Sequence, residues 1–305
     1  MSRAEGRTRV VPLDGPLDLA LTLGPLRVGH GDPTWSIGDR EAWHGLRTPA
    51  GPATVRLTHL GDAVSAECWG EGVDWCIDHA PRMVGVGDGR GQFDPVAGSA
   101  LDRQSRRQPG HRMAASLDTF SRAVSAVLGQ RVTATEAIRS WRQMADAWGE
   151  PAPGPVPDGL RLGPAPETLM ATGYSAFHPM GVERGRADTI RSLARHGRRI
   201  TDLADQPLDE ASRVLRLMRG VGPWTESVVR QTALGDPDCV ILGDLHIPGQ
   251  VCMAILGTSG GDDEMLEALD RFRPLRGLAQ RLAVSIGVGP QRRGPRYRPL
   301  PIARW

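Results

Sequence analysis

The chain has 305 residues, a formal net charge of +2 and 37 basic residues, every one of which is arginine. The absence of lysine excludes a P-loop phosphate site, a pyridoxal Schiff base and a lysine nucleophile. With 40% hydrophobic residues but no apolar run of the roughly 18 residues that a membrane span requires, the composition predicts a globular chain of about two domains.

The first 110 residues are predicted to form a strand-rich domain. Residues 17–23 alternate leucine with smaller or polar residues, which is typical of a half-buried strand. Residues 54–60 and 63–69 repeat the alternation on either side of a Gly-Asp turn, and this arrangement predicts a hairpin. The glycine-rich segment 85–91 lacks the strand-then-helix context of a phosphate loop, so we interpret it as a plain loop.

The cysteines lack the spacing of a metal cluster or a disulfide framework. They are Cys68, Cys76, Cys239 and Cys252, and no two form a CxxC pair. An alternative takes Cys68, Cys76 and His79 as zinc ligands, but we interpret them as two buried thiols and a surface imidazole, so no metal site is predicted. No apolar signal core precedes residue 23, and we therefore expect a cytoplasmic location.

From residue 111 to residue 288, apolar residues recur at three- and four-residue spacing, which predicts a helical domain. The first helix is expected around residues 117–128. The further expected helices cover residues 134–148, 166–171, 184–196, 208–218, 224–234, 245–256 and 262–272. A Pro/Gly-rich stretch at 150–166 predicts an exposed connector, and residues 289–305 form a basic tail that either follows a DNA backbone or is simply solvated. The fold class is therefore expected to be α+β.

The segment 217–225 is predicted to be a tight turn between two helices. Gly220 and Gly222 allow a reversal with positive φ, and Pro223 suits the first turn of the following helix. Such a turn directs backbone N–H groups outward at a helix N-terminus, where they can hold a phosphate without any lysine. The alternative is an ordinary helix-turn-helix with a glycine cap.

Asp244 is the natural N-cap of the next expected helix. Capping alone would explain it. A carboxylate at this place is also stabilised by the helix dipole and by backbone N–H groups, and it lies one helix and one turn beyond the phosphate-binding turn. Cleavage of an N-glycosidic bond in DNA requires this combination of a fixed negative charge and a backbone clamp. The acidic run 262–264 is interpreted as compensation of a helix dipole.

These motifs resemble those of a known superfamily. Residues 220–225 followed by 243–247 resemble the helix-hairpin-helix motif and catalytic aspartate loop of HhH-GPD DNA glycosylases, and they are similar to the 3-methyladenine DNA glycosylase II (AlkA-like) branch. The resemblance covers most of residues 112–284. Its weaker parts are residues 120–124, 128–132, 186–190, 193–194 and 273–277. The resemblance implies a strand-rich N-terminal domain before an all-helical glycosylase core.

Residue by residue, the resemblance implies that Asp244 is the catalytic carboxylate and that Trp224 lies in the base pocket, stacking on an alkylated purine, with a buried core position as the alternative. Lyase members of the superfamily carry a lysine at the position of Trp224. Val228 and Val284 fall where some members have aromatic walls, which implies a less aromatic pocket. The implied DNA-binding residues are Gly220, Val221, Gly222, Thr225, Gln130, Arg131 and His246.

Two of these roles have alternatives. Arg131 stands where the family often places the wedge that fills the gap left by a flipped nucleotide, and it would equally serve as a solvated helix-end arginine that touches phosphate. His246 would orient water or contact phosphate, or it would only pack at a helix N-terminus.

The expected function is therefore monofunctional release of 3-methyladenine- and 7-methylguanine-type purines from damaged double-stranded DNA, leaving an abasic site. The resemblance implies a bacterial, nucleoid-associated monomer without membrane attachment or cofactor, apart from a structural monovalent cation at the hairpin. The alternatives are a damage-binding protein with little or no turnover and a glycosylase for oxidised or deaminated bases.

Overall fold

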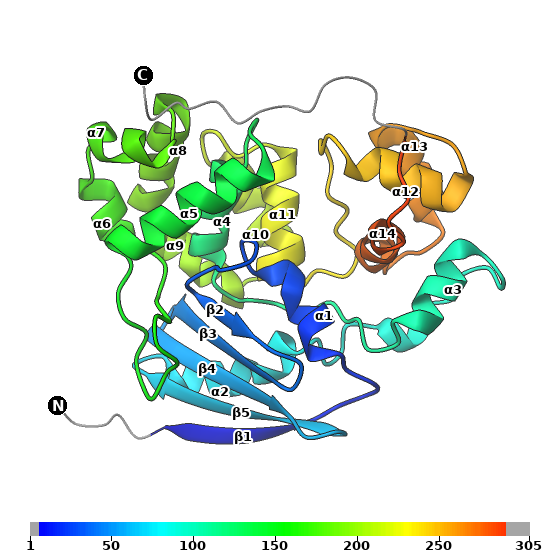
Figure 1. Cartoon of the computed structure of the whole chain (residues 1–305), viewed down its shortest axis with the longest axis horizontal. Coiled ribbons are helices and arrows are strands. Elements are labelled where there is room, and N and C mark those ends of the chain that lie inside the picture. Colours follow the sequence, from blue (N-terminus) through cyan, green and yellow to red (C-terminus); the bar gives the residue numbers. More distant parts are fainter. Residues whose placement is uncertain (1–5, 291–305) are drawn as a thin grey trace.

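The computed structural model describes residues 6–290, in which an antiparallel sheet lies beside a larger helical region (Figure 1). The sheet has the strand order β1-β5-β4-β3-β2. Its strands are β1 (Arg7–Pro12), β2 (Trp35–Ile37), β3 (Glu41–Thr48), β4 (Gly51–His59) and β5 (Ala63–Gly70). The hairpin expected from residues 54–60 and 63–69 is confirmed, because β4 and β5 pair with Thr58 opposite Ser65.

The strand expected at residues 17–23 is wrong, because this segment contains the helix α1 (Leu19–Leu23). Alternate leucines include a pair four residues apart, Leu19 and Leu23, and both are fully buried on one side of the helix. The Asp18 side chain caps the helix by accepting a hydrogen bond from the N–H of Leu21 at 2.8 Å. The segment 85–91 is a loop as expected, and a short 3₁₀ turn begins only at Arg90.

The helices follow mostly where the apolar spacing predicts them. They are α2 (Val73–Met83), α3 (Ala100–Arg107), α4 (Thr119–Leu128), α5 (Ala134–Trp148), α6 (Pro166–Ala171), α7 (Tyr174–Phe177), α8 (Arg184–Arg195), α9 (Gly197–Thr201), α10 (Leu208–Leu217), α11 (Pro223–Ala233), α12 (Ile247–Leu256), α13 (Asp262–Asp270) and α14 (Arg276–Ser285). Four 3₁₀ turns join them at Gly24–Leu26, Arg90–Gln92, His178–Met180 and Asp202–Asp205. The sequence pattern missed α2, α3, α7, α9 and α14.

Three large apolar cores and one smaller cluster organise the described chain. One lies between the sheet and α2, which packs against β1, β4 and β5. The second lies among α4 to α11, and the third unites α12, α13 and α14 with Leu101 of α3. In Figure 1 the helices α4 to α11 lie above the sheet, and α12, α13 and α14 lie beside them on the right, with the segment that joins α11 to α12 between the two groups. The α+β class is confirmed; the boundaries at residues 110 and 288 remain predictions.

The connector 150–166 is only partly exposed, contrary to expectation. Ala152, Leu160 and Leu162 are buried, and they pack on Trp43 and Trp69 of the sheet. The proline- and glycine-rich chain therefore covers one end of the sheet, because its few apolar residues remove two large indole rings from water. The arginines at positions 292, 293, 296, 298 and 304 lie outside the described residues. Within residues 6–290, no helix is both long and apolar enough to cross a membrane.

Candidate functional site

The turn between α10 and α11 holds its two glycines in different conformations. Gly220 has a φ of +83°, and a Cβ there would lie 2.5 Å from Oγ1 of Thr189, so this position requires glycine. Gly222 was expected to share the positive φ, and this is wrong: its φ of −93° and ψ of −177° are extended. A Cβ on Gly222 would meet no atom within 4 Å. Gly222 therefore leaves open space in front of α11.

The N-terminus of α11 faces that space without a side-chain cap. Pro223 occupies its first turn, as expected, so the backbone N–H groups around it can bind an anion. Val221 and Thr225 are 8% and 1% exposed as whole residues. Both are therefore almost completely covered, and the DNA-binding role expected of them stays a prediction.

Gln130, at the end of α4, braces this turn. Its Nε2 donates to the carbonyl of Gly220 at 2.9 Å and to Oγ1 of Thr225 at 2.8 Å. The next residue, Arg131, is exposed and adopts a left-handed φ of +56°. Gln130 thus has a structural role in the turn, whereas the wedge and phosphate roles of Arg131 stay predictions.

Asp244 lies ahead of α12, which begins at Ile247 rather than directly after the carboxylate. Its Oδ1 accepts hydrogen bonds from the backbone N–H groups of His246 at 2.8 Å and Ile247 at 3.0 Å. Its Oδ2 accepts a hydrogen bond from Nε1 of Trp224 at 3.1 Å. Three N–H donors therefore fix a carboxylate that remains only half-buried.

Trp224 contacts two segments of the site, the loop that carries Asp244 and the end of α4 at Gly129. One edge of its half-exposed ring donates to Asp244, and the other lies against Gly129, where a Cβ would come within 3.0 Å of Cη2. The ring is not a fully buried core residue. Val228, one turn further along α11, is 8% exposed, and Val284 of α14 is partly buried.

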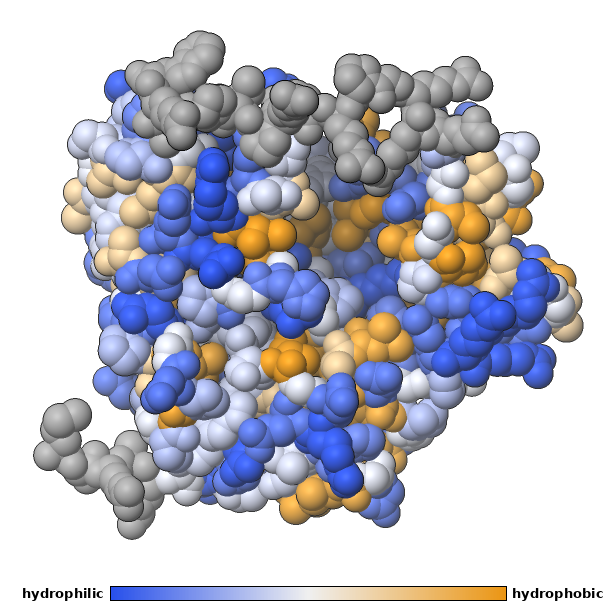
Figure 2. All heavy atoms as spheres, in the orientation of Figure 1, coloured by the Kyte–Doolittle hydropathy of each residue, from blue (hydrophilic) through white to orange (hydrophobic). Residues whose placement is uncertain are grey.

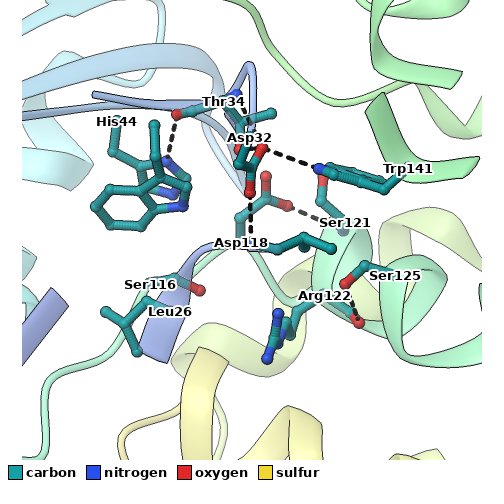
Figure 3. Close-up of a pocket in the computed structure, with 12 residues that line it drawn as sticks. Leu26, Asp32, Thr34, His44, Ser116, Asp118, Ser121, Arg122, Ser125 and Trp141 are labelled. Atoms are coloured by element: carbon teal, nitrogen blue, oxygen red, sulfur yellow. Dashed lines mark hydrogen bonds between the residues drawn. The ribbon is translucent and has the colours of Figure 1, made fainter. Parts of the chain in front are cut away.

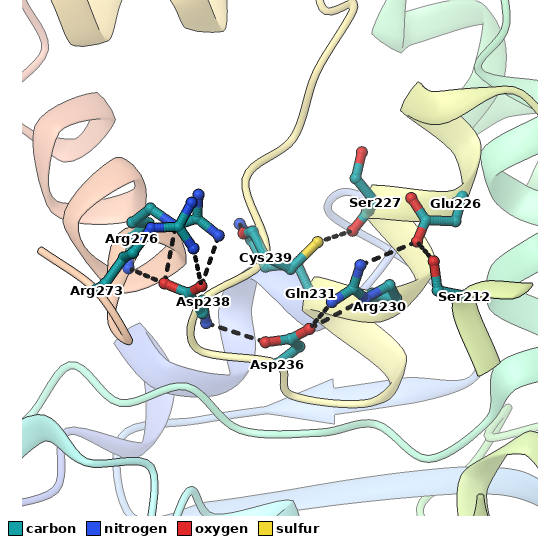
Figure 4. A network of polar contacts seen from close by, with 10 residues as sticks. All are labelled: Ser212, Glu226, Ser227, Arg230, Gln231, Asp236, Asp238, Cys239, Arg273 and Arg276. Carbon is teal, nitrogen blue, oxygen red and sulfur yellow. Dashed lines mark hydrogen bonds and ion pairs between the residues drawn. The ribbon is translucent and has the colours of Figure 1, made fainter. Parts of the chain in front are cut away.

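The segment before Asp244 is held by a polar network on both sides (Figure 4). Asp238 pairs with Arg276 at 2.6 Å and Arg273 at 3.5 Å, while Nε of Arg230 donates to Asp236 at 3.0 Å. Burial acts to raise the pKa of Asp238, but its hydrogen bonds with Arg276 hold that pKa below its usual range. The paired charges anchor this segment between α11 and α14, and so determine where Asp244 lies.

Two further contacts continue this anchoring. The backbone N–H of Ile241 donates to Oε1 of Gln280 at 2.9 Å, and that of Gly243 donates to Oδ2 of Asp262 at 2.8 Å. Asp262 therefore does more than compensate a helix dipole, because it also fastens the residue next to Asp244.

A cavity of about 210 Å³ separates α10 and α11 from α13 and α14. Its polar walls include Arg216, Glu226, Arg230 and Asp238, and its apolar walls include Leu242 and Leu266. The space-filling view shows the surface hollowed between the two helical groups, with apolar residues inside the hollow (Figure 2). Trp224 and Asp244 are not among the residues that line the cavity, so the contact between them lies outside it.

Sequence reasoning missed an exposed apolar side chain beside Asp244. Leu245, directly after Asp244, is 88% exposed. The sequence around Leu245 predicts the start of a helix. This prediction does not indicate whether the leucine side chain points toward solvent. An apolar group in this position is available to contact a ligand at the carboxylate.

The zinc alternative fails in the described part of the chain. Cys68 and Cys76 are buried free thiols, while Nε2 of His79 lies 3.0 Å from Asp205. A hydrogen bond with Cys68, together with burial, raises the pKa of Cys76 well above its ordinary value, so this thiol is protonated. Across residues 6–290, no group of three or more His, Cys, Asp or Glu side chains could hold a metal ion.

Sequence comparison gives relatives with named activities. The chain is 28% identical over 132 residues to DNA-3-methyladenine glycosylase 2 of Escherichia coli (strain K12), which is 43% of this chain and 46% of that protein. The match therefore spans about half the length of this relative. No family model matches the chain.

Structure comparison covers nearly the whole chain. The 3-methyladenine DNA glycosylase from Archaeoglobus fulgidus matches with a TM-score of 0.72 at 16% identity, over 92% of this chain and 98% of that one. An 8-oxoguanine glycosylase/lyase from Clostridium acetobutylicum matches with a TM-score of 0.65 at 12% identity, over 93% and 98%. The resemblance to DNA glycosylases is confirmed, and the chain has their fold. Because that fold serves enzymes of different chemistry, the site has to decide the reaction.

Proposed function

We propose that this chain is a monofunctional DNA glycosylase that releases alkylated purines from duplex DNA and leaves an abasic site. The observation that carries the proposal is the contact between Asp244 and Trp224, which holds a carboxylate beside an aromatic ring at the hairpin. The sequence similarity to a protein named DNA-3-methyladenine glycosylase 2 supports the same chemistry.

The carboxylate supplies the electrostatic part of the reaction. A base within the duplex has to be rotated out of the stack before it can be cleaved, at a cost of a few kcal/mol that is smaller for a lesion with weakened pairing. Loss of the base leaves positive charge at C1′ of the sugar. At an effective dielectric constant of 20, a carboxylate about 4 Å away stabilises that charge by roughly 4 kcal/mol, or about a thousandfold in rate.

An effect of this size suits leaving groups that are already activated. Purines alkylated at N3 or N7 carry a positive charge, so they depart without a strong general acid. The half-exposed Trp224 ring can stack on such an electron-poor base. A lyase step through a lysine Schiff base is excluded because the chain has no lysine, and Trp224 stands where lyases of this fold carry theirs.

The hairpin supplies the grip on DNA. The uncapped N-terminus of α11 and the open space at Gly222 support contact with a backbone phosphate. Two exposed residues are further candidates for contact with DNA: His246, two positions after Asp244, and Arg131, directly after Gln130. We propose damaged double-stranded DNA as the partner, a monomer as the active form and the nucleoid as the place of action.

The test is release of N3-methyladenine and N7-methylguanine from alkylated duplex DNA under single-turnover conditions. We expect release by the wild type and a loss of about a thousandfold in Asp244→Asn. Asp263→Asn is the matched control, because Asp263 is exposed on the first turn of α13. Equal release by wild type and Asp244→Asn would overturn the catalytic assignment.

Two other outcomes distinguish the alternatives. Tight binding to damaged duplexes without release of any base would identify a damage-binding protein. Release only of oxidised or deaminated bases would move the substrate class away from alkylated purines.

A further inference from the structure

The carboxylate of Asp262 is bound to the loop that carries Asp244. Its Oδ2 accepts a hydrogen bond from the backbone N–H of Gly243 at 2.8 Å. Asp262 is the first residue of α13, and Gly243 directly precedes Asp244, so this contact joins a helix to the loop across 19 positions of sequence. The Asp262 side chain thus holds the backbone one residue before the proposed catalytic carboxylate.

The loop segment 239–243 contains neither helix nor strand, so side chains of other helices supply hydrogen bonds to it. Nε2 of Gln231 on α11 donates to the carbonyl of Cys239 at 2.9 Å. Gln280 on α14 accepts from the N–H of Ile241 at 2.9 Å and donates to its carbonyl at 3.1 Å. The contact from α13 is the third anchor of this segment, and it is the one nearest in sequence to the carboxylate.

The helix that supplies this third anchor is itself held firmly. Met265 and Leu269 of α13 are fully buried in the same apolar core as Val251 of α12, and the two helices pack against each other (Figure 1). Closely packed cores of this kind resist displacement. Because α12 begins three residues after Asp244, the bond from α13 ties both sides of the carboxylate to one helical unit.

Gly243 also packs on the aromatic side of the site. It has a left-handed φ of +73°, and a Cβ on it would lie 3.7 Å from Cβ of Trp224. Trp224 is the residue whose indole donates to Asp244. The hydrogen bond of Asp262 therefore restrains the loop at the point where it passes the partner of the carboxylate.

Compensation of the helix dipole does not account for this geometry. Any carboxylate of the run 262–264 would serve the dipole, yet its members are used differently. Oε2 of Glu264 accepts from the N–H of Gly261 at the start of its own helix at 2.9 Å, and Asp263 is exposed. Asp262 turns to another segment, and its Oδ1 is buried without a hydrogen-bond partner among the described residues.

We infer that Asp262 is a positioning residue for Asp244, and that it fixes how closely the carboxylate approaches the sugar of the flipped nucleotide. This inference rests on the proposed function. With an effective dielectric constant of 20, retreat of a carboxylate from about 4 Å to about 5 or 6 Å lowers the stabilisation of a positive charge enough to slow the reaction roughly 4- to 10-fold. The effect of Asp262 is therefore expected to be far smaller than that of Asp244 itself.

Two substitutions at Asp262 separate its hydrogen bond from its charge. Asp262→Ala removes the acceptor, and we expect single-turnover release of alkylated purines to slow by about 4- to 10-fold with an unchanged Kd for damaged duplex. Asp262→Asn keeps a carbonyl oxygen that can accept from Gly243, so we expect its rate to match the wild type. An equal loss in both variants would assign the effect to charge and overturn the positioning role.

Glu264→Ala is the matched control. It also removes a carboxylate that accepts from a glycine N–H on the first turn of α13, but that glycine belongs to the helix and not to the loop. We expect a similar loss of stability with no loss of rate. A rate as low as that of Asp262→Ala would show that general loosening of α13 is responsible, and the specific role of Asp262 would be wrong.

Hydrogen exchange measured by NMR tests the same contact without any reaction. In Asp262→Ala we expect the N–H of Gly243 and the indole N–H of Trp224 to exchange about tenfold faster, and in Glu264→Ala we expect no change. Unchanged exchange at the indole would overturn the inference. A wild type that releases no alkylated purine would overturn the proposed function instead, and the exchange rates would still decide whether Asp262 holds the contact between Trp224 and Asp244.

Discussion

Nε1 of Trp224 donates a hydrogen bond to Oδ2 of Asp244 at 3.1 Å, and this contact joins two residues that lie 20 positions apart. The ring that is proposed to stack on the base is therefore also the ring that orients the carboxylate. The proposed substrate recognition and the proposed charge stabilisation therefore depend on one side chain. A substitution at Trp224 affects both unless the ring and its N–H group are changed separately.

Trp224→Phe and Trp224→Leu separate these two roles. Phenylalanine keeps an aromatic face but loses the donor, so we expect the single-turnover release rate to fall about 10- to 100-fold, the value of one hydrogen bond to a charged group, with little change in affinity for a cationic lesion. Leucine should lose rate and affinity. Identical rates for wild type and Trp224→Phe would show that the N–H group has no part in the reaction.

The two hairpin glycines should respond differently to substitution. Gly220→Ala places a methyl group against Thr189 at a positive φ, and we expect it to lower the free energy of unfolding by about 2 kcal/mol. Gly222→Val suits the extended backbone there, so we expect normal stability but weaker binding to all duplexes alike, because phosphate contacts do not depend on sequence.

Thermal unfolding and fluorescence titration with damaged and undamaged duplexes measure these effects. Gly185→Ala is the control, since Gly185 lies on α8 with open space around it. Selective loss of binding to a single lesion in Gly222→Val would argue against phosphate contact at the hairpin.

Asp118 should make stability depend on pH. Burial raises the pKa of its carboxyl from 3.8 to about 6, so the folded state binds a proton more tightly than the unfolded state. This contribution to the free energy of unfolding is fully present below about pH 4 and is lost as the pH rises through 6, by up to about 3 kcal/mol. Among its neighbours, His44 titrates with the opposite sign, because burial lowers its pKa to about 4.

The difference between Asp118→Asn and wild type isolates this group, the N-cap of α4, from the titration of His44, which lines the same small cavity (Figure 3). Asparagine can still cap α4 and does not titrate. We expect the variant to gain stability relative to wild type as the pH rises from 4 to 7, measured by urea unfolding at several pH values. A difference that is constant with pH would contradict the raised pKa.

Leu245 should matter for DNA and not for folding. Its side chain is 88% exposed, so Leu245→Gln is expected to change the free energy of unfolding by less than about 0.5 kcal/mol. A leucine beside the proposed catalytic carboxylate can press on the duplex next to a flipped nucleotide, as apolar wedges do. We expect weaker binding to damaged duplexes and slower release. Met170→Gln, at an exposed methionine of α6, is the control; an equal effect there would remove the special role of Leu245.

Much of the helical region could be predicted from the sequence, because its helices bury one face each and their apolar residues recur at a helical spacing. The prediction failed for segments that lack a single buried face or a clear helical spacing of apolar residues. Helix α14 is buried on most sides and carries Gln280 and Arg281 inside the protein, so no polar face marks it as amphipathic. The spacing of the leucines in residues 17–23 fits the two-residue period of a strand and also the four-residue spacing of a helix. The cap at Asp18 and the joint burial of Leu19 and Leu23 favour the helix.

The sequence predicted the motifs of the candidate site separately. It did not predict the hydrogen bonds that connect them. Asp244, Trp224 and the hairpin could be named from their order along the chain. The hydrogen bonds of Gln130 to both ends of the hairpin depend on how α4 packs against α11, which no local pattern encodes. The same holds for the fastening of Gly243 by Asp262.

The amide of Gln130 has a consequence for the proposed binding of DNA by the hairpin. Because it ties the carbonyl of Gly220 to the hydroxyl of Thr225, the turn is already ordered before any ligand arrives. Association then loses little conformational entropy in this loop, and more of the contact energy remains as affinity. A chain with a net charge of only +2 can in this way hold a polyanion through preorganised backbone dipoles instead of through an excess of cations.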